Sequence, residues 1–357
     1  MSTPTSGTRR SNAAYRNVDR LFEDSAAQTG VIERRYTIAG RSVLMRFSGA
    51  AMLDRIGAAF AHLETVAALP IDAQPALRIN IWDSASTGAE APPVLGGELA
   101  GDSSGPIYYF EEDGVQAIAR WNTLSVYDSV AGEAWYWAPD ATEMLSWDWA
   151  SPMRMILHWW LGRDGILQVH GGAVGVPKGG VLVVGRGGSG KSTTTLSCLN
   201  GAVDTGLQYA GDDFVAIAIE PAPYVHSLYG SGKLESHHLE RFPNLLAAVA
   251  NPIQGPNDKA VVYAERYLPG VSTAGFPLLA IAVPRVAGVR DTRVVPASKS
   301  AALAALAPST LFQLHPPHPD ALAGMASLVR QVPCFTLELG TDLEQISTSI
   351  VGLLEGL

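Results

Sequence analysis

The segment from Gly185 to Ser192 reads GRGGSGKS and matches the phosphate-binding pattern G-x-x-x-x-G-K-[ST]. The apolar stretch VLVV precedes it, and STTTLSCLN, which is typical of a helix, follows it. In this strand–loop–helix order, glycines let successive backbone N–H groups turn toward phosphate oxygens, and the helix N-terminus adds positive potential. The pattern therefore predicts an α/β fold that binds a nucleotide at the end of a strand.

Individual residues of this loop have expected roles. Lys191 is expected to reach the β- and γ-phosphates, and the Ser192 hydroxyl to ligate a magnesium ion. The residues predicted to bind the nucleotide are Gly185, Gly187, Gly188, Ser189, Gly190, Lys191, Ser192 and Thr193. The sequence leaves the choice between ATP and GTP open, because such a loop contacts phosphates and not the base.

Two adjacent carboxylates, Asp212 and Asp213, follow the loop in the stretch YAGDDFVAIAI. In an ordinary P-loop ATPase one acidic residue ends a buried strand, whereas here strand-like residues continue directly after the pair. Two carboxylates beside a magnesium nucleotide can divide two tasks, one holding the metal and the other accepting a proton from an attacking hydroxyl. A solvated turn is the alternative interpretation of the pair.

His170 stands at the head of the first of two apolar stretches, HGGAVGV and GGVLVVG, which are joined at Pro177-Lys178-Gly179. A hairpin at this point returns the chain antiparallel, so the start of the first strand lies near the end of the second. We therefore expect His170 close to the loop glycines, where it hydrogen-bonds phosphate oxygens or orients an aspartate. A purely structural histidine is the alternative.

Taken together, His170 with Gly171, the loop GRGGSGKS and the segment GDD at 211–213 resemble the HPr kinase/phosphorylase family in order and spacing. The resemblance is strong over residues 165–220 and implies the mixed-sheet P-loop fold that this family shares with phosphoenolpyruvate carboxykinases. It also implies roles: Asp212 as the proton-accepting base, Asp213 as a magnesium ligand with Ser192, and His170 and Lys191 as further catalytic residues.

The chain departs from that family where a metal-binding glutamate is expected, because LYGSGKLESHHLERFP stands there. Glu235 is taken as a third metal ligand in its place, and Lys233 as a contact for phosphate or substrate. The chain is more similar to HPr-kinase-related proteins of natural-product clusters, including those that phosphorylate the C-terminal serine of lasso-peptide precursors. The tail RQVPCFTLELGTDLEQISTSI adds to this resemblance, which implies a serine of a peptide or protein as the acceptor.

The N-terminal half of the chain has the features of a separate, smaller α+β domain. Its expected elements are a hairpin at 34–48, a helix at 50–63, a strand at 75–84, a loop at 84–105 and antiparallel strands between 106 and 140. A helix over 151–165, capped by Ser151, is expected to begin the next domain. We predict a flexible arm over 1–29 that can become helical near NVDRLFED at 17–24, an α+β domain over 30–150 that recognises substrate or a partner, and a catalytic domain over 151–357.

Composition excludes some classes of function. The formal net charge of -9 argues against general binding to nucleic acid, which needs a basic surface. We find no signal peptide and no apolar run long enough to span a bilayer, so we expect a cytoplasmic protein with no membrane partner. The sequence leaves the oligomeric state open. Cys198 and Cys334 are expected to be inert thiols.

Two other functions remain open from the residues alone. One is a small-molecule kinase of the same fold, and the other is a nucleotide-binding sensor or scaffold with little turnover. A carboxykinase acting on oxaloacetate is disfavoured, because no residues for that substrate are evident. Of the remaining cations, Lys259, Arg266 and Arg285 are expected to form surface or structural pairs.

Overall fold

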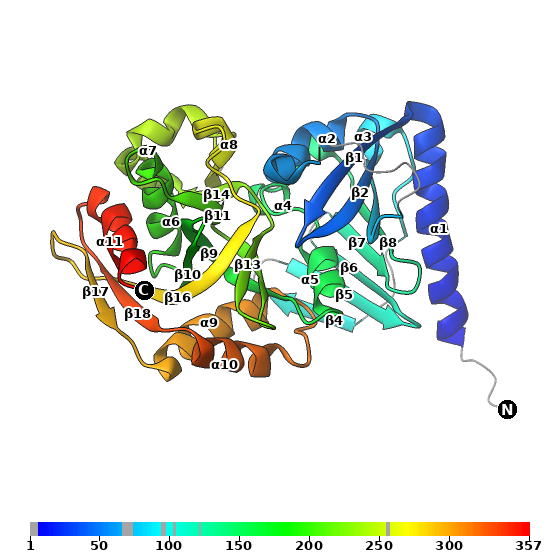
Figure 1. The fold of residues 1–357 in the computed structure, drawn as a ribbon. Coiled ribbons are helices and arrows are strands. Elements are labelled where there is room, and N and C mark those ends of the chain that lie inside the picture. Colours follow the sequence, from blue (N-terminus) through cyan, green and yellow to red (C-terminus); the bar gives the residue numbers. More distant parts are fainter. Residues whose placement is uncertain (1–5, 66–73, 94–97, 103–104, 121–122, 255–257) are drawn as a thin grey trace. The chain divides into compact units, whose positions relative to one another are not determined.

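The computed structural model describes residues 6–65, 74–93, 98–102, 105–120, 123–254 and 258–357 (Figure 1). By internal contacts the chain divides into two compact units, each with its own large sheet. The first unit comprises Met1–Ala58, Leu63–Trp149 and Met153–Trp160; the second comprises Ala59–His62, Ala150–Pro152 and Leu161–Leu357.

The first unit contains an eight-stranded sheet in the order β1-β2-β3-β8-β7-β6-β5-β4. Its strands are β1 (Val31–Ile38), β2 (Arg41–Ser48), β3 (Leu77–Asp83), β4 (Glu98–Asp102), β5 (Gly105–Glu112), β6 (Val115–Arg120), β7 (Thr123–Asp128) and β8 (Glu133–Ala138). The predicted β1–β2 hairpin and the antiparallel run β5 to β8 are confirmed. Both residues of the Asp113-Gly114 turn have positive φ, as a tight two-residue hairpin turn requires.

Helices of the first unit differ from the sequence-based expectation in two places. They are α1 (Ser6–Thr29), α2 (Ala51–Ile56), α3 (Ser84–Thr87), α4 (Ser146–Trp149) and α5 (Arg154–Gly162), with 3₁₀ turns at Gly57–Leu63 and Ala141–Glu143. Helix α1 includes the segment 17–24 that was expected to become helical, and it extends to all described residues of the predicted flexible arm; Val18, Leu21 and Phe22 are buried in a core cluster with Trp82. The predicted loop over 84–105 contains α3 and the edge strand β4.

The predicted boundary before residue 151 also differs from the division into units. Helix α5 was assigned to the second domain, but its residues as far as Trp160 belong to the first unit. The physical reason is aromatic packing: the Trp159 ring lies 6.3 Å from that of Tyr109, and the Arg41 guanidinium lies 5.8 Å from the Trp160 ring.

The second unit is built on a mixed sheet in the order β10-β9-β12-β13-β16-β18-β17, with β11 also paired to β9. Its strands are β9 (Leu167–Val176), β10 (Gly179–Val184), β11 (Gln208–Gly211), β12 (Phe214–Ala218), β13 (Tyr224–Ser227), β16 (Gly275–Val286), β17 (Arg293–Pro296) and β18 (Cys334–Leu339), beside a separate ribbon of β14 (Ser231–Glu235) and β15 (Lys259–Tyr263). The long strand β16 pairs antiparallel with β13 and parallel with β10 and β18. The mixed sheet agrees with the predicted α/β class.

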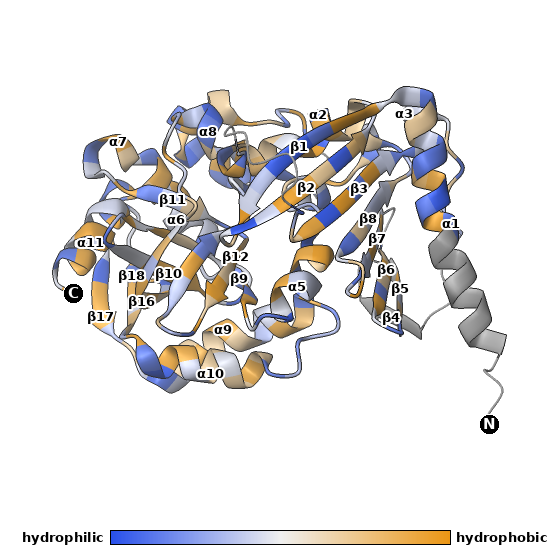
Figure 2. Cartoon of the chain, turned by 45° about the vertical axis from the view of Figure 1, so that its right-hand side comes forward, coloured by the Kyte–Doolittle hydropathy of each residue, from blue (hydrophilic) through white to orange (hydrophobic). Residues whose placement is uncertain are grey.

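Helices cover both faces of this sheet. They are α6 (Lys191–Asn200), α7 (Ala202–Thr205), α8 (Ala264–Tyr267), α9 (Lys299–Gln313), α10 (Ala321–Gln331) and α11 (Glu344–Glu355), with 3₁₀ helices at Ser236–Arg241 and Pro243–Ala248. One core cluster joins the sheet to α9 and α10, and another joins it to α6 and α11. Figure 2 shows hydrophobic residues interrupted by hydrophilic ones along α9 and α10, as suits helices with one buried face.

Two smaller observations bear on the sequence-based expectations. Cys198 and Cys334 are free and buried, and burial raises the pKa of the Cys198 thiol to about 12, as an inert thiol requires. Within the described part of the chain, every helix is too short or too polar to cross a lipid bilayer.

Candidate active site

Strand β9 brings the predicted site residues together. On one side it pairs antiparallel with β10, with Gly171 opposite Val184, so the predicted hairpin is confirmed. On its other side it pairs with β12, where His170 lies opposite Phe214, and the Gly171 N–H donates to the Asp213 carbonyl over 3.1 Å. His170 therefore lies between the start of the loop after β10 and the aspartate pair.

The aspartates lie at a break between β11 and β12, beside a crowded part of β9. Gly211 has a φ of +145°, in the region that favours glycine, and the ladder register shifts at this residue. A Cβ on Gly172 would lie 2.4 Å from Thr195 Cγ2, 2.9 Å from the Gly211 carbonyl oxygen and 3.0 Å from that of Asp212. Only glycine lets β9 pass this close to both α6 and the aspartates.

Substitution of Gly172 by alanine is expected to lower the free energy of unfolding by about 1–3 kcal/mol, because the added methyl overpacks a backbone contact. Urea unfolding measures this change. Gly352→Ala in α11 is the matched control, since nothing lies within 4 Å of a Cβ at that position. Equal unfolding midpoints for the two variants would contradict the crowding argument.

The phosphate-binding loop connects β10 to α6, which begins at Lys191. Gly188 and Gly190 have φ values of +74° and +104°, so the loop uses backbone conformations that favour glycine. The Lys191 ammonium folds back over the loop and donates to the carbonyls of Gly185, over 2.7 Å, and Arg186, over 3.3 Å. Its hydrogen-bond partners in this state are therefore neutral groups of the loop.

The loop residues fit a bound phosphate chain. Ser189 Oγ is buried and has no hydrogen-bond partner among the described residues. Gly187 and Gly188 are exposed, and a Cβ on either would meet nothing within 4 Å, so a ligand has room beside them. Ser192 and Thr193 are half-buried in the first turn of α6. All eight residues predicted to bind the nucleotide lie in this loop and the adjoining turn.

Asp212 is buried against α6. Its Oδ1 accepts a hydrogen bond from Thr195 Oγ1 over 2.5 Å, and its Oδ2 accepts one from the Lys233 backbone N–H over 3.0 Å. Ser192 adds a further hydrogen bond. Burial nevertheless raises the pKa of Asp212 above its ordinary value, because loss of solvation outweighs these hydrogen bonds. A raised pKa makes this carboxylate the stronger base of the pair.

Asp213, in contrast, is surrounded by a lysine, a serine and a histidine side chain. Its Oδ2 accepts from Lys233 Nζ over 2.5 Å and from Ser151 Oγ over 3.1 Å, and its Oδ1 lies 3.4 Å from His170 Nε2. Burial acts to raise the pKa of Asp213, but the Lys233 charge and the His170 hydrogen bond together hold it well below the ordinary value. Asp213 therefore stays ionised in this site at neutral pH.

His170 is oriented by α9. Gln313 Nε2 donates to its Nδ1 over 3.0 Å, so the ring proton is on Nε2 and faces Asp213. The His170 backbone N–H donates to Thr310 Oγ1 over 3.1 Å, and the Phe214 ring packs 5.2 Å from the imidazole. Burial lowers the pKa of His170 in spite of the neighbouring carboxylate, so the ring is neutral. Of the two expected partners of His170, phosphate or an aspartate, the structure shows the aspartate, Asp213.

The oxygen atoms of Ser192, Asp212 and Asp213 suit magnesium, which typically takes one or two carboxylates and completes its shell with water and substrate phosphates. Glu235 does not join them. The β14–β15 register sets Glu235 opposite Lys259, and the two half-exposed side chains form an ion pair over 2.9 Å. The structure therefore gives no support to Glu235 as a third metal ligand, and that role stays a prediction.

Sequence reasoning missed several residues that contact the aspartates. Thr195 follows Lys191 by one helical turn, so helical periodicity was a usable signal for it. Ser151 was expected to cap a helix, but that helix begins at Arg154 and the Ser151 hydroxyl donates to Asp213 instead. Gln313 is 143 residues from His170 in the sequence, and no local sequence pattern predicts their contact.

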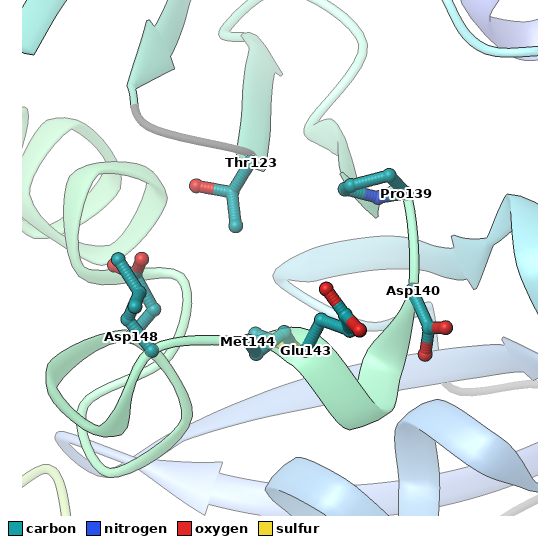
Figure 3. Close-up of a pocket in the computed structure, with 7 residues that line it drawn as sticks. Thr123, Pro139, Asp140, Glu143, Met144 and Asp148 are labelled. Carbon is teal, nitrogen blue, oxygen red and sulfur yellow. The ribbon is translucent and has the colours of Figure 1, made fainter. Parts of the chain in front are cut away.

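A shallow pocket in the first unit contains none of the predicted site residues (Figure 3). It is lined in part by three acidic side chains, Asp140, Glu143 and Asp148. The Asp140 carboxylate already accepts from the N–H and hydroxyl of Thr142, both over 2.7 Å.

Comparisons with known proteins give similarities to solved structures, one of which is described below. No protein-family model matches the chain, and no curated protein matches it. Among solved structures it is similar to the Hpr(Ser) kinase/phosphatase from Coxiella burnetii, with 11% identity over 53% of this chain and 94% of that chain, at a TM-score of 0.27. A TM-score this low gives no support to a function, so any function has to be argued from the residues of the site.

Proposed function

We propose that the second unit transfers the γ-phosphoryl group of ATP or GTP to a hydroxyl group. One observation carries this proposal: beside the loop that ends at Lys191 lie two adjacent carboxylates with different partners, Asp212 held by Thr195 on α6 and Asp213 by the Lys233 ammonium and His170. The pKa values of the two are shifted in opposite directions in accord with these surroundings. Environments that push the pKa values of two neighbouring carboxyl groups apart are typical of sites where one group acts as base and the other stays ionised.

We assign the roles as the family resemblance implies them. Backbone N–H groups of the loop and the Lys191 ammonium hold the phosphates, and Ser192 and Asp213 hold magnesium, which when bound neutralises phosphate charge. Asp212, with its raised pKa, accepts the proton of the attacking hydroxyl. Neutral His170 fixes the orientation of Asp213.

One observation favours a second distribution of the two carboxylate roles. Asp212 accepts a hydrogen bond from Thr195 of α6 and is buried, whereas Asp213 is half-buried and contacts His170. In this arrangement Asp212 lies on the metal side with Ser192, and Asp213 with His170 faces the acceptor. Both distributions serve the same overall reaction.

For the acceptor we propose a serine of a peptide or protein, supported by the resemblance to HPr-kinase-related proteins of natural-product clusters. The first unit recognises this acceptor or a partner protein. A small-molecule hydroxyl is the alternative substrate, and a nucleotide-binding sensor or scaffold with little turnover is the alternative function.

Incubation with γ-labelled ATP or GTP, magnesium and a panel of serine-containing peptides tests the proposal. We expect label to appear on a peptide serine, and omission of magnesium to abolish the transfer. Label on small hydroxyl compounds alone would favour the small-molecule kinase. Tight nucleotide binding without transfer to any acceptor would favour the sensor or scaffold.

A further inference from the structure

Lys233 contacts both carboxylates of the site by different groups. Its backbone N–H donates to Asp212 Oδ2 over 3.0 Å, and its ammonium donates to Asp213 Oδ2 over 2.5 Å. The Lys233 side chain is 10% exposed, and no second acceptor for Nζ is present among the described residues. Lys233 therefore contacts both carboxylates, and its positive charge compensates the charge of Asp213.

The backbone of Lys233 is fixed in place. Strand β14 pairs with β15, with Lys233 opposite Val261, and Ser231 Oγ donates to the carbonyl of Ala150. A Cβ on Gly232 would lie 2.7 Å from Leu196 Cδ2, so β14 packs directly on α6. Because the strand is held on both sides, only the side chain of Lys233 is free to change position.

The ammonium also occupies the position that a metal ion would need at Asp213. Lys233 and Ser151 both donate to Oδ2, while Oδ1 faces His170. A divalent ion that binds Asp213 Oδ2 has to displace the lysine, because two cations in contact with one oxygen repel strongly in a partly buried site. Removal of the lysine charge should therefore make Asp213 a better metal ligand.

We propose that Lys233 is an internal counter-cation that occupies Asp213 in the nucleotide-free protein and releases it to the magnesium that enters with the nucleotide. This role rests on the proposed function. The phosphates bring negative charge that a lone metal ion lacks, so they offset the repulsion and give the released ammonium a new partner. Lys233 thereby makes metal binding at Asp213 depend on nucleotide binding.

Mn²⁺ binding to the nucleotide-free protein, followed by electron paramagnetic resonance of the free ion, tests this proposal without requiring turnover. We expect Lys233→Met to bind Mn²⁺ at least about tenfold more tightly than the unmodified protein, since one opposing charge is removed. The added substitution Asp213→Asn should abolish that gain. Lys178→Met is the matched control, because Lys178 is exposed in the turn between β9 and β10, and it should bind Mn²⁺ as the unmodified protein does.

Unchanged or weaker Mn²⁺ binding by a folded Lys233→Met protein would overturn the proposal, as would a gain that persists after Asp213→Asn. Lys233→Gln, which keeps two N–H donors for Asp213, is the second variant should the methionine protein fail to fold. In the unmodified protein a non-hydrolysable nucleotide should tighten Mn²⁺ binding, and equal binding with and without it would also contradict this role. A Mn²⁺ gain in a protein that transfers no phosphoryl group would disprove the proposed kinase and leave the role of Lys233 intact.

Discussion

Replacement of Lys191 by methionine is expected to lower kcat/KM for phosphoryl transfer by about 10²- to 10³-fold, the usual effect of removing one preorganised charge from a transition state. The ammonium is held by neutral carbonyls of its own loop, so its charge is available to the β- and γ-phosphate oxygens. Steady-state kinetics with labelled nucleotide measure the loss, and titration with a fluorescent nucleotide analogue measures the accompanying fall in affinity.

Lys178→Met is the matched control, because Lys178 is exposed in the turn between β9 and β10 and the substitution changes the net charge by the same amount. It should leave kinetics and affinity unchanged. Thermal unfolding separates catalysis from folding, and we expect Lys191→Met to stay folded, since burial already disfavours the charged ammonium and lowers its pKa. Full activity of the methionine variant would exclude the loop as the phosphate site.

The loop and the hairpin before it can be predicted from sequence because their determinants are local. A glycine-rich loop between an apolar stretch and a helix has few alternative conformations, and a three-residue join between apolar strands requires an antiparallel return. From these two facts alone His170 is expected near Gly185. The register of β9 against β10 bears out that reasoning.

The remaining contacts depend on pairing between distant segments, which no local pattern specifies. Lys233 reaches the aspartates only because β14 packs on α6, and Gln313 reaches His170 only because α9 lies along β9. The same cause explains why the pairing of Glu235 with Lys259 could not be foreseen, since it follows from a β14–β15 register that the sequence does not reveal. The helix over 6–29 was expected only near 17–24, because its buried face packs on residues such as Trp82 that come much later in the chain.

Replacement of Asp212 by asparagine is expected to lower kcat by about 10²- to 10⁴-fold, the range for loss of a general base. The substitution suits the site. The amide oxygen can accept from the Lys233 N–H, and the amide nitrogen can donate to Thr195 Oγ1. The threonine hydroxyl can then turn its own proton to the carbonyl of Lys191, 3.2 Å away, or of Ser192, 3.3 Å away. The Asp212→Asn protein should therefore fold normally, and its loss of activity then reports the loss of the proton-accepting carboxylate.

Two measurements on Asp212→Asn and Asp213→Asn decide which carboxylate is the base: kcat, and the affinity for Mn²⁺ with a non-hydrolysable nucleotide bound. If Asp212 is the base, Asp212→Asn loses turnover and keeps Mn²⁺ affinity within about threefold, while Asp213→Asn weakens Mn²⁺ binding. The opposite pattern assigns the metal to Asp212 and the proton to Asp213 with His170. Glu235→Gln tests the third predicted metal ligand. Because its half-exposed carboxylate pairs with Lys259, we expect both measurements to match those of the unmodified protein, and weaker Mn²⁺ binding would assign Glu235 to the metal site. If both aspartate variants keep the kcat of the unmodified protein, neither residue is the general base.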